Sequence, residues 1–507
     1  MVLYPGKLKA KSVDIALIVE SSYPYIMGGV STWVEQILLS FPQYKFALIF
    51  LGGSPDNYKD GIRYKIPPNV THFQVHYLFG DEKPPAHLKQ HSEAERKKSV
   101  ESMLNVHKAF RCSHIESMNE IGNLDLYKSG TGLDYQQFLY SETSWQILTE
   151  QYTENCPDIS FIDYFWTVRN IHKPLWIIAD IVVNFPKARL VHTASTGYSG
   201  LLAFLVNKHR KFPVTLTEHG IYTKERRIDV FLSSNFRDDY VIDHPLADLS
   251  YLRTMWDRYF KTLAQLCYNI AQPIASLSKS ANIIQVEEGA DAKKTVIIPN
   301  GVDIERFKKL RQPYEKKSDL VCLVGRIVAM KDVKGFIRAV PKIHSAVPDY
   351  KFWIIGSIDQ DPIYAEECHA LVENISFKEH IKFHLHQNMD DVLPKVRLMV
   401  LSGIREGMPF VILESFAAGI PVIATDVGAC REMVLGADDA DKAIGPAGKI
   451  VKTADTESLE QAIIEILTDE KEWKKMSKAA IQRVERYYDQ KIIMKRYGEI
   501  YKKQMTD

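Results

Sequence analysis

Two glutamates in the last quarter of the chain have a spacing that suggests ligand binding. Glu406 and Glu414 are eight positions apart, which is roughly 12 Å along a helix, and carboxylates accept hydrogen bonds from sugar hydroxyls. Such a pair on a helix otherwise indicates only a solvated face. Glu414, however, lies between the apolar runs 411–413 and 416–418, and a charge in apolar surroundings requires a partner. The pair therefore predicts a site that binds hydroxyls at two places on one extended ligand.

The segment around Glu406 is predicted to be a loop between a strand and a helix. The apolar run 399–402 predicts the strand, and residues 410–418 predict the helix. Ligands of open α/β sheets bind where strands end, and a helix N-terminus offers N–H groups and partial positive charge to a diphosphate. Gly407 allows the backbone to approach a ligand, and Pro409 suits the first helical turn.

The first half of the chain offers two comparable positions at predicted strand ends. The strand predicted at 15–19 is followed by Gly28 and Gly29, and a glycine pair between a strand and a helix lets a ligand approach the backbone. His219 follows another apolar run beside Gly220. A single histidine is usually structural, but one at a strand end is a candidate for a ligand-binding cleft.

The elements that must position these residues alternate between short strands and longer helices. Apolar runs typical of buried parallel strands occur at 15–19, 46–50, 320–324, 352–355, 399–402 and 421–424. This alternation predicts an α/β fold with two Rossmann-like, doubly wound domains that face each other across a cleft. We predict an N-terminal domain at 1–310 with a helical insertion at about 81–145, a C-terminal domain at 311–485, and a C-terminal helix at 486–507 that returns to the N-terminal domain and packs across both.

Composition narrows the class of protein. The chain has 64 lysines and arginines against 63 aspartates and glutamates, which argues against nucleic acid as a partner. Its six cysteines form no C-x-x-C pair, which indicates a reducing compartment and no zinc or disulfide framework. No apolar run is long enough to predict a membrane span. We therefore expect a cytoplasmic protein that reaches the inner face of a membrane only through partners.

Four motifs, in order along the chain, resemble those of one enzyme family. They are Pro-Asn-Gly-Val-Asp at 299–303, Val-Gly-Arg at 324–326 with Lys331, the pair Glu406 and Glu414, and Ala-Gly-Ile-Pro-Val-Ile-Ala-Thr at 418–425. The set is similar to that of the retaining glycosyltransferases of family 4, which have the GT-B fold. The resemblance implies that Arg326 and Lys331 neutralise a nucleoside diphosphate, with Lys334 as the alternative to Lys331. It also implies that Glu406 binds hydroxyls of the donor sugar and that Glu414 binds the ribose.

The resemblance implies the remaining site residues as well. The donor site is predicted at Gly28, Gly29, Arg326, Lys331, Glu406, Gly407, Met408, Pro409, Phe410 and Glu414. His219 and Glu406 are the predicted catalytic residues, and Tyr23, His192, Ser195 and Thr196 are the predicted acceptor residues. We expect no cofactor and no metal. Retention is expected through a front-face displacement in which the leaving phosphate helps to deprotonate the acceptor.

More narrowly, residues 20–33 and 195–200 resemble glycosyltransferases of bacterial Pel exopolysaccharide systems, which contribute to biofilms. This implies transfer of a hexose or hexosamine from a UDP-sugar to a growing glycan, with membrane-bound polysaccharide synthase or export subunits as partners. Two alternatives remain. A sugar-nucleotide epimerase with a GT-B-type fold would need no acceptor, and a non-catalytic glycan- or nucleotide-binding subunit of a synthase complex would bind without turnover.

Overall fold

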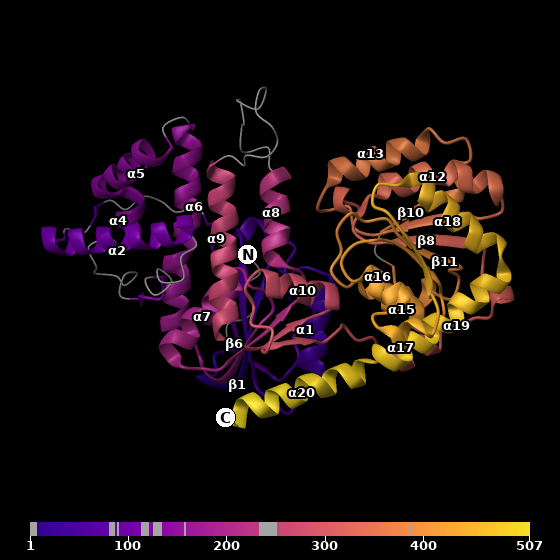
Figure 1. Ribbon diagram of the computed structural model, residues 1–507, viewed down its shortest axis with the longest axis horizontal. Helices are drawn as coiled ribbons and strands as arrows, with labels where there is room; N and C mark the ends of the chain where they lie inside the picture. Colours follow the sequence, from indigo (N-terminus) through magenta and orange to yellow (C-terminus); the bar gives the residue numbers. More distant parts are fainter. Residues whose placement is uncertain are drawn as a thin grey trace. The chain divides into compact units, whose positions relative to one another are not determined.

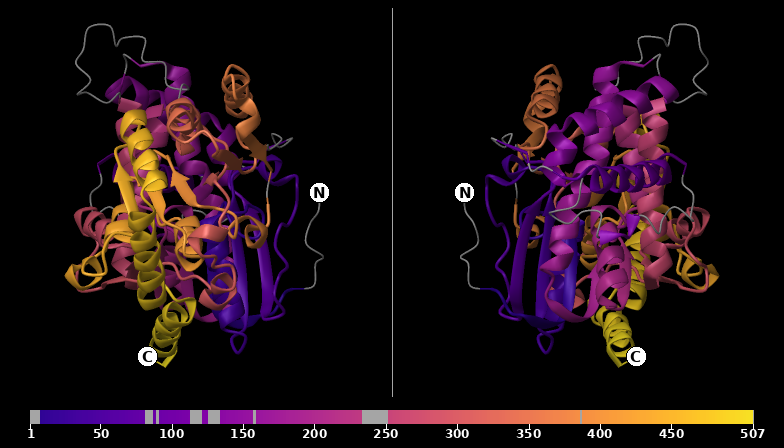
Figure 2. Two further views of the ribbon diagram at one scale, coloured as in Figure 1. Left: turned by 90° about the vertical axis from the view of Figure 1, so that its right-hand side faces the viewer. Right: turned by 90° about the vertical axis from the view of Figure 1, so that its left-hand side faces the viewer.

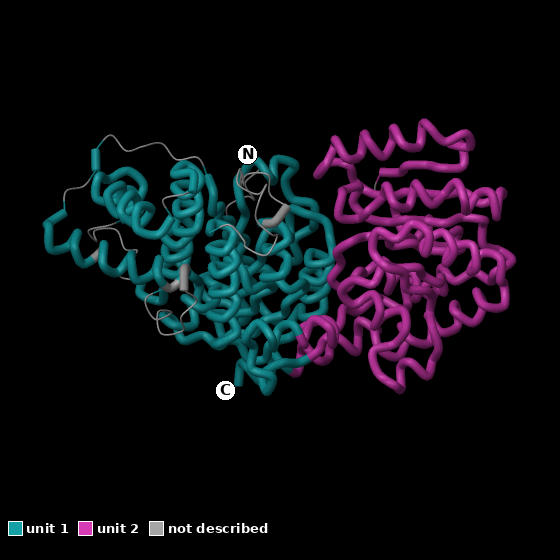
Figure 3. Tube along the Cα trace, turned by 45° about the horizontal axis from the view of Figure 1, so that its top comes forward, with its two compact units in different colours: residues 1–275, 284–296, 500–507 teal, residues 276–283, 297–499 magenta. Residues whose placement is uncertain are grey.

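The chain forms two compact units in the computed structural model (Figure 3). The structure describes residues 8–80, 87–88, 91–112, 121–124, 134–156, 159–232, 251–385 and 387–506. Unit 1 consists of residues 1–275, 284–296 and 500–507, and unit 2 consists of residues 276–283 and 297–499.

A sheet forms the centre of unit 1 (Figures 1 and 2). Its strands lie side by side in the order β3-β2-β1-β4-β5-β6-β7. The strands are β1 (Ser12–Glu20), β2 (Phe46–Gly52), β3 (Val70–Tyr77), β4 (Lys187–Thr193), β5 (Val214–Glu218), β6 (Ala271–Ser276) and β7 (Thr295–Ile297). β1 pairs in parallel with both β2 and β4. Residues 15–19 have no exposed surface, because a central parallel strand is covered on both faces. The strands predicted at 15–19 and 46–50 are confirmed.

Along the sequence, helices alternate with the strands of unit 1, and an additional group of helices is inserted between β3 and β4 (Figure 1). The helices are α1 (Gly29–Ser40), α2 (Glu93–Cys112), α4 (Tyr135–Tyr140), α5 (Glu142–Asn155), α6 (Phe161–Val183), α7 (Tyr198–Arg210), α8 (Tyr222–Leu232) and α9 (Tyr251–Ile270), with α10 (Lys279–Glu287) shared with unit 2. We call α2, α4, α5 and α6 the helical layer.

The helical layer corresponds to the insertion predicted at about 81–145, but it is longer than predicted. The described part of that range is helical in α2, α4 and the start of α5, while residues 81–86, 89–90, 113–120 and 125–133 lie outside the described residues. The helices continue to the end of α6, because its residues Ile171, Leu175 and Ile178 join the same apolar core.

The sheet of unit 2 is parallel and has the order β10-β9-β8-β11-β12-β13. Its strands are β8 (Leu320–Val324), β9 (Lys351–Ile355), β10 (Ile381–His384), β11 (Leu398–Leu401), β12 (Val422–Thr425) and β13 (Gly448–Val451). Its helices are α11 (Ile304–Lys308), α12 (Val333–Ala346), α13 (Pro362–Glu373), α14 (Met389–Val392), α15 (Phe410–Ala417), α16 (Cys430–Leu435), α17 (Asp439–Lys442), α18 (Thr456–Thr468), α19 (Glu470–Tyr487) and most of α20 (Gln490–Thr506). The strands predicted at 320–324, 352–355, 399–402 and 421–424 are present within a residue or two.

The boundary between the units differs from the predicted position at residue 310. Residues 297–310 belong to unit 2, because the backbone of Val302 exchanges hydrogen bonds with Tyr488 and Gln490 (2.9 and 3.0 Å). The return to unit 1 also comes later than the predicted residue 486, since only residues 500–507 of the last helix belong to unit 1. Within the described residues, no helix is both long and apolar enough to span a membrane.

The end of α20 is held in unit 1 by a buried histidine. His192 has no exposed surface, and its Nδ1 and Nε2 lie 2.8 Å from the Tyr501 hydroxyl and 2.9 Å from Thr217 Oγ1. Burial, with a smaller contribution from His219, lowers the pKa of His192 to about 3. The ring is therefore neutral at physiological pH.

This buried histidine makes stability depend on pH. Below pH 6.5 His192 of the unfolded chain binds a proton, whereas His192 of the folded chain binds one only below about pH 3. Protonation therefore favours the unfolded chain, and the contribution of His192 to the free energy of unfolding is lost as pH falls. We expect His192→Gln to destabilise the protein at pH 7.5 by about 1–3 kcal/mol, and the deficit to shrink by about 1.4 kcal/mol at pH 5.5, in urea unfolding. Tyr501→Phe, which removes one hydrogen bond and no titrating group, is the control with a constant deficit. A constant deficit for His192→Gln would contradict the assignment.

Candidate functional site

Both sheets reverse their strand order once, and several of the predicted site residues lie on loops at these two points. In unit 2 the order reverses between β8 and β11, and in unit 1 between β1 and β4. At such a point the loops that follow the two strands leave the sheet toward opposite faces, which opens a crevice at the carboxyl edge.

In unit 2, an ion pair joins the loops that follow β8 and β11. Lys331 Nζ lies 2.5 Å from Glu406 Oε1, and the two side chains are 22% and 8% exposed. Gly403, also in the loop after β11, lies against this carboxylate: a Cβ on Gly403 would lie 3.0 Å from Glu406 Oε1. A partly buried pair is screened less by water and salt than a surface pair. The structure thus brings together the predicted lysine and the predicted glutamate.

The other two predicted phosphate-binding cations are placed differently. Arg326 is exposed directly after β8, and its Nη1 donates to Gln360 Oε1 at 2.5 Å. Lys334 instead pairs with Glu367 (2.5 Å) and lies over the ring of Tyr364. Lys334 therefore belongs to the packing between α12 and α13, and Lys331 is the lysine that reaches Glu406.

The turn before α15 is fixed by the segment that precedes unit 2's first strand. The buried Asn300 donates from its backbone N–H to Met408 Sδ (3.2 Å) and from Nδ2 to the Met408 carbonyl (3.0 Å). The Met408 side chain is buried in the core, so only its backbone is available to a ligand. Pro409 is the N-cap of α15 and Phe410 is its first residue. Sequence reasoning noted the Pro-Asn-Gly motif without assigning Asn300 a role.

The loop after β12 packs against the same turn. The Ala429 N–H donates to the Gly407 carbonyl at 2.8 Å. Gly428 has a positive φ of 53°, and a Cβ there would lie 2.1 Å from the Glu406 carbonyl oxygen, so only glycine fits. Thr425 Oγ1 also donates to the Gly403 carbonyl. The loop after β12 therefore positions the backbone of the loop that carries Glu406.

Glu414 lies on the second turn of α15, in the apolar setting that the sequence predicted. Burial raises the pKa of its carboxyl to about 7, with Arg306 opposing the rise and Asp390 adding to it. Arg306 itself pairs with Asp390 (2.9 Å). Glu414 is therefore close to half-protonated at neutral pH, which makes its charge sensitive to any ligand that donates hydrogen bonds to it.

In unit 1, the predicted glycine pair lies at the start of α1. Gly28 is the N-cap and Gly29 the first helical residue; both are exposed, and a Cβ on Gly28 would meet open space. The Thr32 N–H donates to the Gly28 carbonyl (2.9 Å). The first N–H groups of such a helix point toward solvent and suit an anion.

His219 follows β5, and its ring packs edge-on against Trp33 of α1, with 4.6 Å between the ring centroids. Its Nε2 has no hydrogen-bond partner among the described residues. Burial lowers the pKa of His219 to about 3. The ring is neutral at pH 7, so it can exchange one hydrogen bond but cannot serve as a cation.

Three of the four predicted acceptor residues are buried in this structure. His192 and Thr196 are fully buried and already hydrogen-bonded, the first as described above and the second to Glu218 Oε1 (3.0 Å). Tyr23 is also fully buried and packs against Tyr64. Only Ser195 keeps partial exposure. Strand ends in a parallel sheet carry both ligand residues and core residues, and the sequence pattern does not separate them.

Sequence reasoning left the roles of two buried carboxylates of unit 1 open. Glu218 accepts hydrogen bonds from the Tyr268 hydroxyl, Gln285 Nε2, Thr196 Oγ1 and the Tyr222 N–H, all within 2.8–3.1 Å. Glu20 accepts from the Tyr222 hydroxyl (2.9 Å) and the Ser199 N–H (3.1 Å). They link the ends of β1 and β5 to α7, α8 and α9, and so fix the loop that carries His219.

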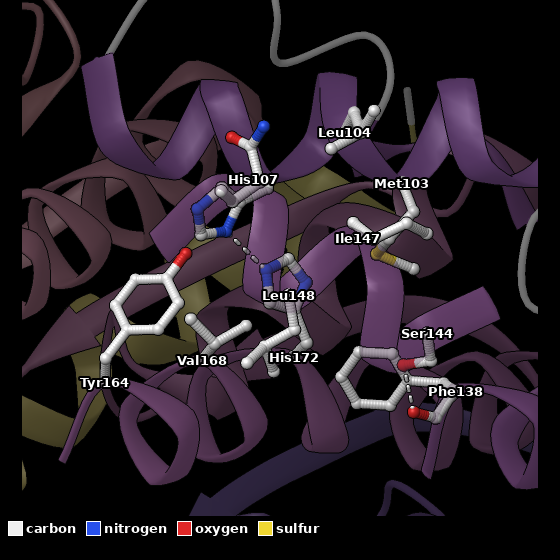
Figure 4. Close-up of a pocket in the computed structure, with 11 residues that line it drawn as sticks. Met103, Leu104, His107, Phe138, Ser144, Ile147, Leu148, Tyr164, Val168 and His172 are labelled. Carbon is white, nitrogen blue, oxygen red and sulfur yellow. Dashed lines mark hydrogen bonds between the residues drawn. The ribbon is translucent and has the colours of Figure 1, made fainter. Parts of the chain in front are cut away.

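A small cavity, separate from the predicted site residues, lies inside the helical layer (Figure 4). It has about 30 Å³ accessible to water, and its lining is mainly apolar. Within it His107 Nδ1 lies 3.0 Å from His172 Nε2, and burial lowers the pKa of His172 well below its usual value. The neutral His172 in an apolar space does not offer the charge that a nucleotide phosphate requires, so we do not assign this cavity to the site.

Asn300 provides a direct test of how the turn before α15 is held. Asn300→Ala leaves the buried Met408 carbonyl without its donor, so we expect a loss of about 1–3 kcal/mol of stability and faster amide exchange in residues 404–409. Asn374→Ala, which removes an exposed hydrogen bond to Ala370 within one helix, is the control. Unchanged exchange in 404–409 would show that Asn300 does not hold the turn. Thermal unfolding and hydrogen-exchange mass spectrometry measure both effects.

The sequence is similar to known glycosyltransferases over its second half. Residues 305–483 match the family described as glycosyl transferases group 1. A GDP-mannose-dependent alpha-(1-6)-phosphatidylinositol monomannoside mannosyltransferase of Mycolicibacterium smegmatis is 29% identical over 191 residues, which are 34% of this chain and 47% of the relative. A UDP-Gal:alpha-D-GlcNAc-diphosphoundecaprenol alpha-1,3-galactosyltransferase of Escherichia coli is 26% identical over 204 residues, 37% of this chain and 49% of the relative. The chain spans about half the length of these curated relatives.

Solved structures of similar fold extend over nearly the whole chain. A glycosyltransferase of Rickettsia africae aligns with a TM-score of 0.56 and 14% identity over 98% of this chain and 99% of its own. The Anabaena protein HepE in complex with UDP-glucose aligns with a TM-score of 0.57 and 13% identity over 97% and 100%. These likenesses confirm the predicted GT-B fold class. Residues 13–293 match the Domain of unknown function DUF3492. The chain therefore belongs to the DUF3492 family and carries, in unit 2, a domain of the glycosyl transferases group 1 family.

Proposed function

We propose that the protein is a retaining glycosyltransferase that moves a hexose or hexosamine from a UDP-sugar to a growing glycan of Pel-type exopolysaccharide synthesis. The observation that carries this proposal is the pair Lys331–Glu406 at the strand-order reversal of unit 2. Arg326 on the same edge and Glu414 on α15 complete a set suited to a sugar nucleotide. The match of residues 305–483 to glycosyl transferases group 1 supports the class of reaction.

The ion pair explains how the site is kept stable before a donor binds. Without ligand, Lys331 and Glu406 satisfy each other's charge in partly buried surroundings. A diphosphate brings negative charge for Lys331 and Arg326, while sugar hydroxyls bring hydrogen-bond donors for Glu406. Donor binding is then an exchange of partners. As the phosphate leaves, its developing charge is stabilised by cations that are already in place.

The proposed roles of the remaining predicted residues follow from their positions. Gly407, Pro409 and Phe410 form the backbone turn where α15 begins, and Gly28 and Gly29 form the corresponding turn at α1. His219 is the catalytic candidate that unit 1 supplies, and Ser195 is its remaining acceptor candidate.

The choice of donor and pathway rests on the Pel resemblance of residues 20–33 and 195–200. The curated relatives are named for GDP-mannose and for UDP-Gal, and the Anabaena structure holds UDP-glucose, so both nucleotides occur among similar proteins. We propose a cytoplasmic location, with membrane-bound polysaccharide synthase or export subunits as partners. We also propose front-face retention without a cofactor or metal, in which the leaving phosphate takes the acceptor proton.

Variants of the ion pair, with a nearby lysine as the control, test the donor site. Lys331→Ala and Glu406→Gln each remove one member of the ion pair. We expect each to reduce the transfer rate about 100-fold or more and to leave little or no thermal stabilisation by UDP-sugars. Lys334→Ala, three residues along the same segment but paired with Glu367, should keep both. The readouts are UDP release with glycan acceptors and thermal shift against UDP, GDP and ADP sugars, with and without EDTA. Normal transfer by Glu406→Gln would contradict the assignment of the donor site to this ion pair.

The same assay separates the two alternatives. An epimerase would convert the donor to a new sugar nucleotide with no acceptor present, and a non-catalytic subunit would show stabilisation by ligand without turnover. Inhibition by EDTA would overturn the metal-independent mechanism while leaving the donor site intact.

Glu414 makes nucleotide binding depend on pH. Its pKa of about 7 means that half of the free protein must lose a proton near neutral pH before the carboxylate accepts two ribose hydroxyls. We expect the affinity for UDP to fall as pH drops below 7, toward tenfold per pH unit, and binding to release a proton in calorimetry. Glu414→Gln should weaken binding and abolish the pH dependence. Retention of that dependence in the variant would assign the titration to another group.

A further inference from the structure

The helical layer presents exposed aromatic side chains that take no part in the donor site or in the proposed transfer reaction. Tyr140 of α4, Trp145 of α5, and Ile162 and Trp166 of α6 are 38%, 51%, 66% and 57% exposed. We call these four residues the aromatic patch. Large apolar side chains exposed together, rather than singly, mark interaction surfaces.

Two members of the aromatic patch, Trp145 and Trp166, are joined through half-buried rings beneath them. The Trp145 ring contacts those of Phe161 (5.5 Å between centroids) and Phe165 (6.1 Å), and Phe165 contacts Trp166 (5.2 Å). Ile162 lies one helical turn before Trp166 on the same face of α6. The patch therefore forms one surface, unlike the isolated exposed Ile363 of α13.

The chain around the aromatic patch is strongly acidic. Residues 134–168 contain six aspartates and glutamates and no lysine or arginine, and Glu142, Glu150 and Glu154 are exposed. Arg169 follows, but its guanidinium is half-buried over the rings of Phe165 and Phe138 (4.8 and 5.5 Å). α2 of the same layer carries charges of both signs. The aromatic patch thus lies on helices whose exposed charge is negative.

We propose that the aromatic patch binds a basic, amphipathic helix of another protein. Exposed tryptophan and tyrosine provide the anchoring contacts typical of protein interfaces, and the indole faces attract cations. The acidic side chains favour lysines and arginines on the partner. They disfavour an anionic membrane surface, which basic segments recognise, and they disfavour a second copy of this chain, which would bring its own exposed Glu142, Glu150 and Glu154 to the contact. The proposal does not depend on the transfer reaction.

The test uses the full chain and a dye-labelled synthetic helical peptide of leucine and lysine, compared with its leucine–glutamate counterpart. We expect the basic peptide to bind with a roughly micromolar dissociation constant that weakens with added salt. Trp166→Ser should weaken binding about 10-fold, and so should Glu142→Gln/Glu150→Gln/Glu154→Gln. Ile363→Ser and Glu366→Gln, exposed residues of unit 2, are the matched controls and should bind normally. Fluorescence anisotropy measures the affinity, and circular dichroism verifies that each variant is folded.

Several results would overturn the proposal. One is failure of the basic peptide to bind at a protein concentration 100 times the expected dissociation constant. The others are equally tight binding of the acidic peptide, and an unchanged affinity for the basic peptide in both patch variants. Trp166-dependent binding to phosphatidylglycerol vesicles would assign the surface to a membrane instead. Trp166-dependent dimerisation in sedimentation velocity would assign it to a second copy of the chain. Because these variants lie far along the chain from Lys331 and Glu406, donor binding is expected to be normal in all of them.

Discussion

Between β8 and β11 the strand order of unit 2 changes direction, and between β1 and β4 that of unit 1 does the same. A parallel sheet buries its strands on both faces, so polar groups of the strands can reach solvent only at the edges. At the carboxyl edge the reversal sends neighbouring loops to opposite sides and leaves a crevice. The position of Lys331 and Glu406 follows from this constraint, because each lies on a loop leaving one of the two diverging strands. Gly28, which follows β1, has the corresponding place in unit 1.

The two units use carboxylates at these edges in different ways. Glu218 of unit 1 receives four hydrogen bonds from neutral donors, so every lone pair that a ligand needs is already occupied. Glu406 of unit 2 is instead paired with the Lys331 ammonium, and a cation can be shared with a phosphate. The first arrangement fixes a framework and the second allows an exchange of partners. Glu414 is intermediate, since burial and Asp390 raise its pKa and Arg306 only partly opposes the rise.

Much of unit 2 was predictable from the sequence, because its strands and the spacing of its two glutamates depend on residues that are close together in the chain. The apolar run 320–324 is β8 to the residue, and the spacing of Glu406 and Glu414 depends only on one turn and one helix. Contacts between distant segments were not predictable in this way. The ring of His192, for which we expected an acceptor role, contacts Tyr501, 309 residues away. Unit 2 begins before the predicted residue 310 for a similar reason, since Val302 pairs with Tyr488 and Gln490. No local pattern encodes such pairings.

The state of His219 limits the chemistry that unit 1 can contribute. A ring whose pKa burial holds at about 3 carries no positive charge at pH 7, so it can offer a phosphate a hydrogen bond but neither a full positive charge nor a proton as a general acid. A sugar that develops positive charge is favoured by a neutral neighbour over a cationic one, because a nearby cation would repel it. The stabilising negative charge must then come from a carboxylate or from the phosphate itself. The burial of His219 against Trp33 is thus part of the proposed mechanism: it removes a charge that would oppose the reaction.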